Sequence, residues 1–305
     1  MPDPTRQTIS ATEASGLFNV SPYVTRWMLW QRFAKGIDIE SDEHSRMTWG
    51  KKLQPLVLAQ AAEDLKFEVI PNADDTYVRR GLLGCTRDAI VICPDRGPGA
   101  LETKCVFDYR TWMRDWDGGN SAPKHHEIQL QTQMLVGDLK DGAPADEGRS
   151  YSWGVIAAWV CGDMYYFERE PITALWRKLE NQAGAFFESV RSNDPPDPFG
   201  APIEVEWLTR LLPTTKGKVI DLSADQAAAP HAEIAQAYVA AKESESAGKR
   251  IADPLRAKLL ALAGDAEEVW LPGAIKVKIG GNEKSKRLNV YIPEASRDTN
   301  FLMAG

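Results

Sequence analysis

The 305-residue sequence contains no run of eighteen apolar residues, so it predicts no membrane-spanning helix. Its first sixteen residues lack the basic segment and apolar stretch of a secretory signal, and we expect a cytoplasmic protein. Only four cysteines are present, and their spacing fits no zinc or iron–sulfur motif. We interpret them as small apolar side chains of the interior: Cys85, Cys93, Cys105 and Cys161.

An excess of positive charge is also lacking. The chain has 36 basic and 43 acidic residues, a formal net charge of -7. This balance argues weakly against a nucleic-acid-binding protein but does not exclude one, because the local field at a site matters more than the sum. The hydrophobic content of 43% is that of an ordinary globular protein with a sizeable core.

The order of predicted elements indicates an α/β protein of the α+β type, with a mixed central sheet flanked by helices. A Pro-rich linker at 193–202 predicts a first domain at 1–205 and a smaller α+β appendage at 206–305. In the appendage we expect a helical hairpin at 230–264, broken near Asp253-Pro254, and two short strands. Residues 1–16 read as loosely ordered.

Two strand-like segments, CTRDAIVIC at 85–93 and ALETKCVF at 100–107, flank the turn signal PDRGPG and predict an antiparallel hairpin. Side chains alternate along a strand, so Glu102 and Lys104 lie on one face, while Leu101 and Thr103 lie on the other. The turn places Asp88 opposite the Glu102 region. The hairpin therefore brings Asp88, Glu102 and Lys104 onto one small patch.

Such a patch suits phosphodiester hydrolysis, in which a bound Mg²⁺ activates water and neutralises phosphate charge. Mg²⁺ requires only one or two carboxylates. Two other acid-x-Lys triplets, at 64–66 and 138–140, are predicted on helices, where positions i and i+2 do not share a face. A solvated charged face on the hairpin is the alternative interpretation.

The wider pattern resembles the PD-(D/E)XK nuclease superfamily, and more narrowly the YqaJ-like and lambda-type phage exonucleases. GCTRDAIV followed by ALETKCV is similar to the metal-binding hairpin, and IQLQTQMLVGDL is similar to the Gln-x-Gln helix of that family. WGKKLQP is similar to a helical Gly-x-x-x-Glu element, with Gln54 in the place of Glu. The resemblance covers about residues 17–190 and implies a restriction-endonuclease-like core.

By this resemblance, Asp88, Glu102 and the backbone carbonyl of Thr103 would ligate one or two Mg²⁺ ions, with Mn²⁺ able to substitute. Lys104 would orient or polarise the attacking water, and Gln129 would contact that water or a ligand.

The glutamines nearby are assigned lesser roles. Gln131 and Gln133 are interpreted as structural neighbours. The neutral amide of Gln54 would weaken one metal site relative to a carboxylate.

Basic residues are candidates for contact with DNA. By the resemblance, either Arg26 or Arg32 would capture a 5′-phosphate, and the sequence does not choose between them. The full set of candidates is Arg26, Arg32, Arg79, Arg80, Arg87 and Lys124. The basic segment 276–287 is a further candidate for DNA or a partner.

Aromatic and imidazole side chains lie close to these segments. Trp112 and Trp116 flank Arg114, and they either stack on bases or cover an edge of the core. The adjacent His125 and His126 are interpreted as structural, with side chains that point apart.

The resulting functional expectation is a Mg²⁺-dependent exonuclease that degrades linear double-stranded DNA, 5′→3′, in phage-type recombination. The resemblance implies a homo-oligomer, a trimer, and a single-strand annealing protein as a possible partner. A restriction-like or Cas4-like nuclease and a catalytically weakened DNA-binding protein are the alternatives. The missing four-cysteine pattern disfavours the Cas4-like alternative.

Overall fold

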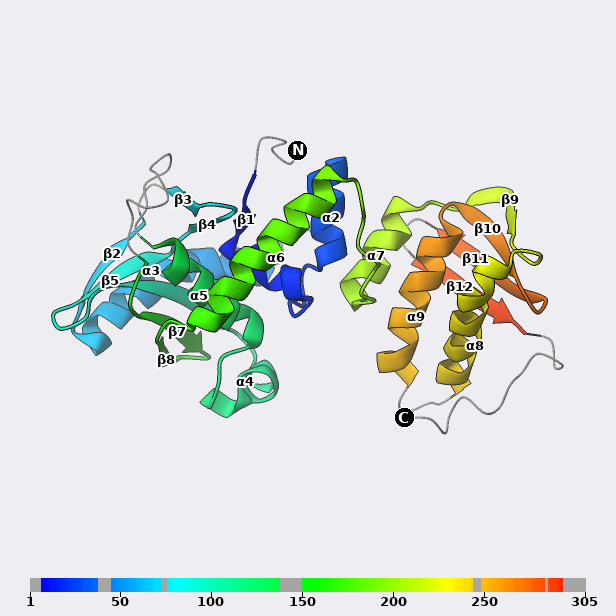
Figure 1. Ribbon diagram of the computed structural model, residues 1–305. Coiled ribbons are helices and arrows are strands. Elements are labelled where there is room, and N and C mark those ends of the chain that lie inside the picture. The colour runs from blue at the N-terminus through cyan, green and yellow to red at the C-terminus, as the bar shows by residue number, and fades with distance from the viewer. Residues whose placement is uncertain are drawn as a thin grey trace. The chain divides into compact units, whose positions relative to one another are not determined.

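The computed structural model describes residues 7–37, 45–72, 76–137, 150–243, 248–282 and 285–292. The chain forms two compact units (Figure 1). The first unit takes in Met1–Val24 and Leu29–Pro195, and the second takes in Thr25–Met28 and Pro196–Gly305. Within the described part of the chain, no helix combines the length and apolar character needed to cross a membrane.

The first unit is built on a five-stranded mixed sheet of order β2-β5-β6-β7-β8. Only β6 and β7 run parallel, and the other neighbours are antiparallel. A parallel pair requires a crossover, and helix α5 lies between β6 and β7 in the chain. The strands are β2 Glu68–Pro71, β5 Ala89–Cys93, β6 Gly97–Val106, β7 Gly154–Val160 and β8 Asp163–Arg169.

Helices cover both faces of this sheet. Helix α3, Ser45–Leu65, packs Val57 and Leu58 in a cluster with Leu101 of β6. Helix α5, Lys124–Val136, packs Leu130 in a cluster with Ala100 on the opposite face. Consecutive residues of β6 therefore enter different cores, as the alternation of a strand requires. This arrangement confirms the predicted fold class, a mixed central sheet flanked by helices.

The predicted strand at 85–93 is interrupted. β4, Leu83–Thr86, ends before Asp88 and pairs with β1 and β3 in a separate three-stranded sheet. The other strands of that sheet are β1 Ile9–Ser10 and β3 Tyr77–Arg80. The chain thus changes sheets around Asp88.

The N-terminal segment is more ordered than its sequence suggested. Helix α1, Ala11–Ala14, starts at a capping box in which Ser10 and Glu13 bond each other's backbone N–H. The 3₁₀ helix η1, Ser15–Phe18, follows, and Leu17 is buried. The prediction of a loosely ordered N-terminus is wrong for the described part of that segment, because the S-x-x-E motif of Ser10 and Glu13 caps a helix there.

The described part of the chain has four further helical segments before Pro195. They are α2 Arg26–Lys35, α4 Tyr109–Asp115, η2 Asp117–Gly119 and α6 Thr173–Arg191.

The second unit contains a four-stranded sheet of order β12-β11-β10-β9 and a helical hairpin. Two expectations are corrected here. The described sheet has four strands where two were expected, and Pro254 lies inside α9 rather than at the break between the helices. The elements are α7 Pro202–Leu211, β9 Thr215–Asp221, η3 Gln226–Ala228, α8 Ala229–Glu243, α9 Gly248–Ala263, β10 Ala266–Leu271, β11 Ile275–Asn282 and β12 Ser285–Tyr291.

Candidate active site

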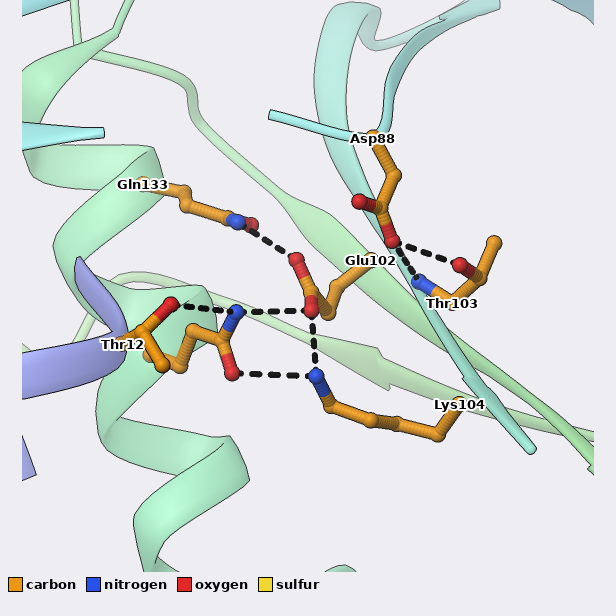
Figure 2. A network of polar contacts seen from close by, with 7 residues as sticks. Thr12, Asp88, Glu102, Thr103, Lys104 and Gln133 are labelled. Atoms are coloured by element: carbon orange, nitrogen blue, oxygen red, sulfur yellow. Dashed lines mark hydrogen bonds and ion pairs between the residues drawn. The ribbon is translucent and has the colours of Figure 1, made fainter. Parts of the chain in front are cut away.

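Asp88 and Glu102 lie opposite each other at one end of the β5–β6 hairpin. Ala89 pairs with Leu101, so the residue before Ala89 faces the residue after Leu101. The Asp88 carboxylate oxygen Oδ2 accepts hydrogen bonds from the Thr103 backbone N–H at 2.7 Å and from the Thr103 hydroxyl at 2.6 Å. These two bonds hold the Asp88 carboxylate against β6, one residue before β5 begins (Figure 2).

Glu102 is the centre of a polar network (Figure 2). Its oxygen Oε1 accepts from the Lys104 ammonium and, at 2.7 Å, from the Gln129 amide. Its oxygen Oε2 accepts from the Gln133 amide at 2.5 Å. Glu102 is only 3% exposed. The alternative of a solvated charged face is therefore wrong, since buried carboxylates require partners of this kind.

Burial and neighbouring charges determine the protonation of Glu102 and Lys104. Burial, and then the neighbouring charge of Asp88, raise the pKa of Glu102 to about 7. Burial would lower the pKa of Lys104, but the carboxylates of Glu102 and Asp88 outweigh it, and the pKa of Lys104 is raised. Lys104 thus stays an ammonium at neutral pH, while Glu102 is close to half-protonated.

The donor set suits a hard divalent cation. Asp88 and Glu102 supply two carboxylates, and Thr103 lies between Glu102 and Lys104 on the same strand. In the part of the chain that the structure describes, no cluster of three or more His, Cys, Asp or Glu side chains is arranged for a metal. A site of two carboxylates completed by backbone oxygen and water is the kind that Mg²⁺ accepts, whereas structural zinc takes four protein ligands.

Helix α5 supplies glutamine side chains to the site. The Gln129 oxygen Oε1 accepts from Lys104 at 3.0 Å, while its nitrogen also lies 3.5 Å from the Thr12 hydroxyl of α1. Gln133 was interpreted as a structural neighbour, and its bond to Glu102 corrects this. The signal was present in the sequence, because Gln129 and Gln133 are four residues apart and share one helix face.

Gln131 differs from its two neighbours. Its amide donates to the backbone oxygen of Glu170, and its oxygen accepts from Ile172 N–H and from the Trp176 indole. All of its bonds described here therefore tie α5 to the segment that begins α6, which is a structural arrangement.

The histidines at the start of α5 lie beside this site. The rings of His125 and His126 are 4.0 Å apart, so the expectation that they point apart is wrong. Burial, followed by the charge of Lys104, lowers the pKa of His125 to about 4 and that of His126 well below its usual value. Both imidazoles are therefore neutral at pH 7, and Tyr23 packs edge-on against His125.

The sequence around this site has a known family. Residues 5–140, which include the hairpin and both glutamines that contact Glu102, match the YqaJ-like viral recombinase domain. This segment, which is less than half of the chain, is therefore similar to the YqaJ-like viral recombinase domain. The resemblance drawn from the hairpin and the Gln-rich helix is confirmed.

No curated protein matches the sequence. Among solved structures, the chain is similar to the alkaline exonuclease LHK-Exo from Laribacter hongkongensis, at 18% identity over 62% of this chain and 90% of that one, with a TM-score of 0.46. The same protein in complex with dAMP aligns at 17% identity over 63% and 92%, with a TM-score of 0.46. A phage-related exonuclease from Haemophilus somnus aligns at 10% identity over 60% and 93%, also with a TM-score of 0.46.

Two arginines proposed for DNA are turned into the first unit. Arg87 is 9% exposed, donates to the backbone oxygen of Gly137 and lies over the Tyr151 ring. Arg80 donates to the Leu135 backbone oxygen and the Ser150 hydroxyl. The prediction that Arg87 contacts DNA is wrong, because its guanidinium is buried.

The remaining basic candidates differ in exposure. Arg32 pairs with the buried carboxylate of Glu13 at 2.6 Å. Arg26 is partly buried, and that burial lowers its pKa. Arg79 and Lys124 have exposed side chains.

The aromatic candidates belong to the core. Trp112 is 1% and Trp116 2% exposed. Their rings stack on each other with centroids 5.5 Å apart, and Trp116 also packs against Phe167. Of the two interpretations, base stacking is therefore wrong and the core edge is correct. Arg114 remains outside, in an ion pair with Asp115.

Gln54 lies on α3, which packs against β6. It is half-buried and stands four residues before the buried Leu58, so it shares the face of α3 that packs against the Leu101 side of β6, whereas Glu102 bonds α5 on the other side. Its effect on a metal remains a prediction.

Two other segments singled out in the sequence are the acid-x-Lys triplet at 138–140 and the basic segment at 276–287. The triplet at 138–140 lies outside the described residues. In the basic segment 276–287, Lys276 and Lys278 pair with Glu268 at 2.8 and 3.8 Å, and Lys286 is buried. Much of that positive charge is used within the second unit.

Proposed function

We propose that this protein is a Mg²⁺-dependent exonuclease that hydrolyses phosphodiester bonds of linear double-stranded DNA from its ends, 5′→3′. The observation that carries the proposal is the buried carboxylate of Glu102, held beside Asp88 and Lys104 within a YqaJ-like viral recombinase domain. Two carboxylates crowded in a low-dielectric site destabilise each other, and a divalent cation between them relieves that repulsion.

Each side chain has a role in this proposal. Asp88 and Glu102, with the Thr103 carbonyl, would hold the cation, and Mn²⁺ would substitute for Mg²⁺. The bound cation supplies the Lewis acidity that neutralises phosphate charge and acidifies water. Lys104 keeps its proton and offers an ammonium that orients the attacking water and offsets phosphate charge. Gln129 accepts from Lys104 and donates to Glu102, which fixes the distance between these two groups.

The DNA contacts and the partners are proposed from the resemblance to the YqaJ-like family. We assign contact with DNA phosphates to the exposed side chains of Arg79 and Lys124 and to the partly buried Arg26. We place the protein in the cytoplasm of a bacterial host, as a homo-oligomer, a trimer, that supplies single strands to an annealing protein. A restriction-like endonuclease is the competing activity, and a weakened DNA-binding protein would be favoured by the neutral Gln54.

One assay separates these functions. Linear and supercoiled circular duplexes are incubated with the protein in Mg²⁺ or in EDTA. We expect the linear duplex to be degraded in Mg²⁺ only, and the circle to be spared. Rapid linearisation of circles would support an endonuclease, and retention of DNA without cleavage in Mg²⁺ would support the binding protein.

Matched variants assign the chemistry to the proposed residues. Glu102→Gln and Asp88→Asn keep the side-chain shapes and should abolish cleavage while DNA binding persists. The control is Asp64→Asn, which alters the acid of another acid-x-Lys triplet, exposed on α3. Full cleavage by Glu102→Gln would sink the assignment.

A further inference from the structure

Three buried glutamines follow one another at alternate positions of α5, and their polar contacts differ. Gln131 satisfies both ends of its amide with partners that join α5 to the next helix. Gln129 satisfies both ends within the active site, on Glu102 and Lys104. Gln133 is 0% exposed, and within the described part of the chain its amide nitrogen donates to Glu102 Oε2. Its own oxygen Oε1 has no hydrogen-bond partner among the described residues.

This one-sided arrangement is informative. A glutamine that served only the packing of α5 would bond through both ends, as Gln131 does. Burying an amide oxygen without a partner is unfavourable, so an apolar side chain at position 133 would avoid a cost that the glutamine incurs. The benefit that offsets this cost lies at the other end of the amide, in its bond to the Glu102 carboxylate.

Gln129 and Gln133 together hold both oxygens of Glu102. They stand one helical turn apart on the same face of α5, and each presents a nitrogen to a different carboxylate oxygen. A carboxylate gripped at both oxygens loses its freedom to rotate about its terminal bond. The helix thereby fixes the plane of the Glu102 carboxylate.

The chemical type of the donor also matters. An amide stabilises the carboxylate anion by a hydrogen bond and adds no net charge, whereas an arginine or lysine in that position would compete with a metal for the same negative charge. Lys104 already supplies one cation to Oε1. A neutral donor at Oε2 leaves that oxygen available to a divalent ion.

We infer that Gln133 is a positioning residue of the active site, which orients the Glu102 carboxylate for a divalent cation through a neutral hydrogen bond to Oε2. The inference rests on the proposed function and deepens it. Gln133 acts through Glu102, so its removal should weaken the use of metal and should not remove the chemistry itself.

The test compares the same substitution at two positions of one helix. Gln133→Met and Gln131→Met each replace a fully buried glutamine with an unbranched apolar side chain of similar length. The cleavage rate of a linear duplex is measured against Mg²⁺ concentration for the whole protein and for both variants. Thermal unfolding is recorded in parallel, because both variants lose buried hydrogen bonds.

Only Gln133→Met is expected to raise the Mg²⁺ concentration for half-maximal rate, by about tenfold or more, since a hydrogen bond to a charged group is lost. At saturating Mg²⁺ its rate should recover to within a few fold of the unaltered protein. Gln131→Met should leave the Mg²⁺ dependence unchanged. If the two variants share one Mg²⁺ curve, Gln133 is structural and the inference is overturned.

A second variant covers the case in which Gln133→Met does not fold. Gln133→Asn keeps the amide but shortens the side chain by one methylene, so its nitrogen should fall short of Oε2 and produce the same shift. A normal Mg²⁺ curve for Gln133→Asn would overturn the inference. If the unaltered protein cleaves no DNA in Mg²⁺ or Mn²⁺, the proposed function fails first, and the role of Gln133 fails with it.

Discussion

Glu102 should give up a proton when the site takes a divalent cation, so metal affinity should fall as the solution becomes more acidic. The pKa of Glu102 is raised to about 7, chiefly by burial and then by Asp88. At pH 6 roughly one tenth of the molecules carry the Glu102 anion and at pH 8 roughly nine tenths, because each pH step changes the ratio tenfold. Mg²⁺ binding should therefore be about tenfold weaker at pH 6 than at pH 8.

The stability of the metal-free protein should change in the opposite direction. The pKa of Glu102 rises from 4.5 in the unfolded chain to about 7 in the folded protein, so the folded state holds this proton more tightly. That contribution to stability is full below pH 4.5 and is lost as the pH rises through about 7. Between pH 6 and pH 8 the loss from Glu102 is on the order of 1 kcal/mol.

Calorimetric titration with Mg²⁺ at pH 6, 7 and 8 measures the first effect, and chemical unfolding in EDTA at the same pH values measures the second. Other groups also titrate, so the comparison is made against Glu102→Gln, in which both changes with pH should shrink or disappear. Asp64→Asn should behave like the unaltered protein. Equal Mg²⁺ affinities at pH 6 and pH 8 would refute the reasoning.

Three further outcomes are expected. Gln54→Glu should lower the Mg²⁺ concentration for half-maximal cleavage, because it adds a carboxylate on the face of α3 that packs against β6; superimposable Mg²⁺ titrations would place Gln54 away from the metal. Trp112→Ala should destabilise the fold by about 3–5 kcal/mol in denaturant unfolding, as expected for a buried indole; unchanged stability with lost DNA binding would restore the stacking interpretation. Arg32→Ala should cost roughly 1–3 kcal/mol of unfolding free energy, since it takes a partner from the buried Glu13, and a stability equal to the unaltered protein would contradict this.

Much of the site could be predicted from local pattern. The alternation along β6 and the turn before it were enough to bring Asp88, Glu102 and Lys104 together, because both follow from strand geometry within some twenty residues. Register across a tight hairpin leaves little freedom. The helical character of α3 and α5 was likewise predicted, from the similarity of WGKKLQP and IQLQTQMLVGDL to helical elements of the family.

Other features depended on which distant segments meet. The burial of Arg87 and Trp112 reflects packing against residues elsewhere in the chain, and a basic or aromatic side chain carries no local sign of it. The break of the predicted strand near Asp88 has the same origin. β4 leaves the hairpin because β1, more than seventy residues upstream, offers it a parallel partner.

The sequence by itself determined the resemblance to the YqaJ-like family, the β5–β6 hairpin and its three charged residues, since each is encoded by residues close together in the chain. Only the tertiary structure decided that Glu102 is buried rather than solvated, that two amides of α5 donate to its two oxygens, and that its pKa lies near 7. Burial and electrostatic coupling arise from the sum of all neighbours in space, and the β6–α5 contact joins residues 27 and 31 positions apart.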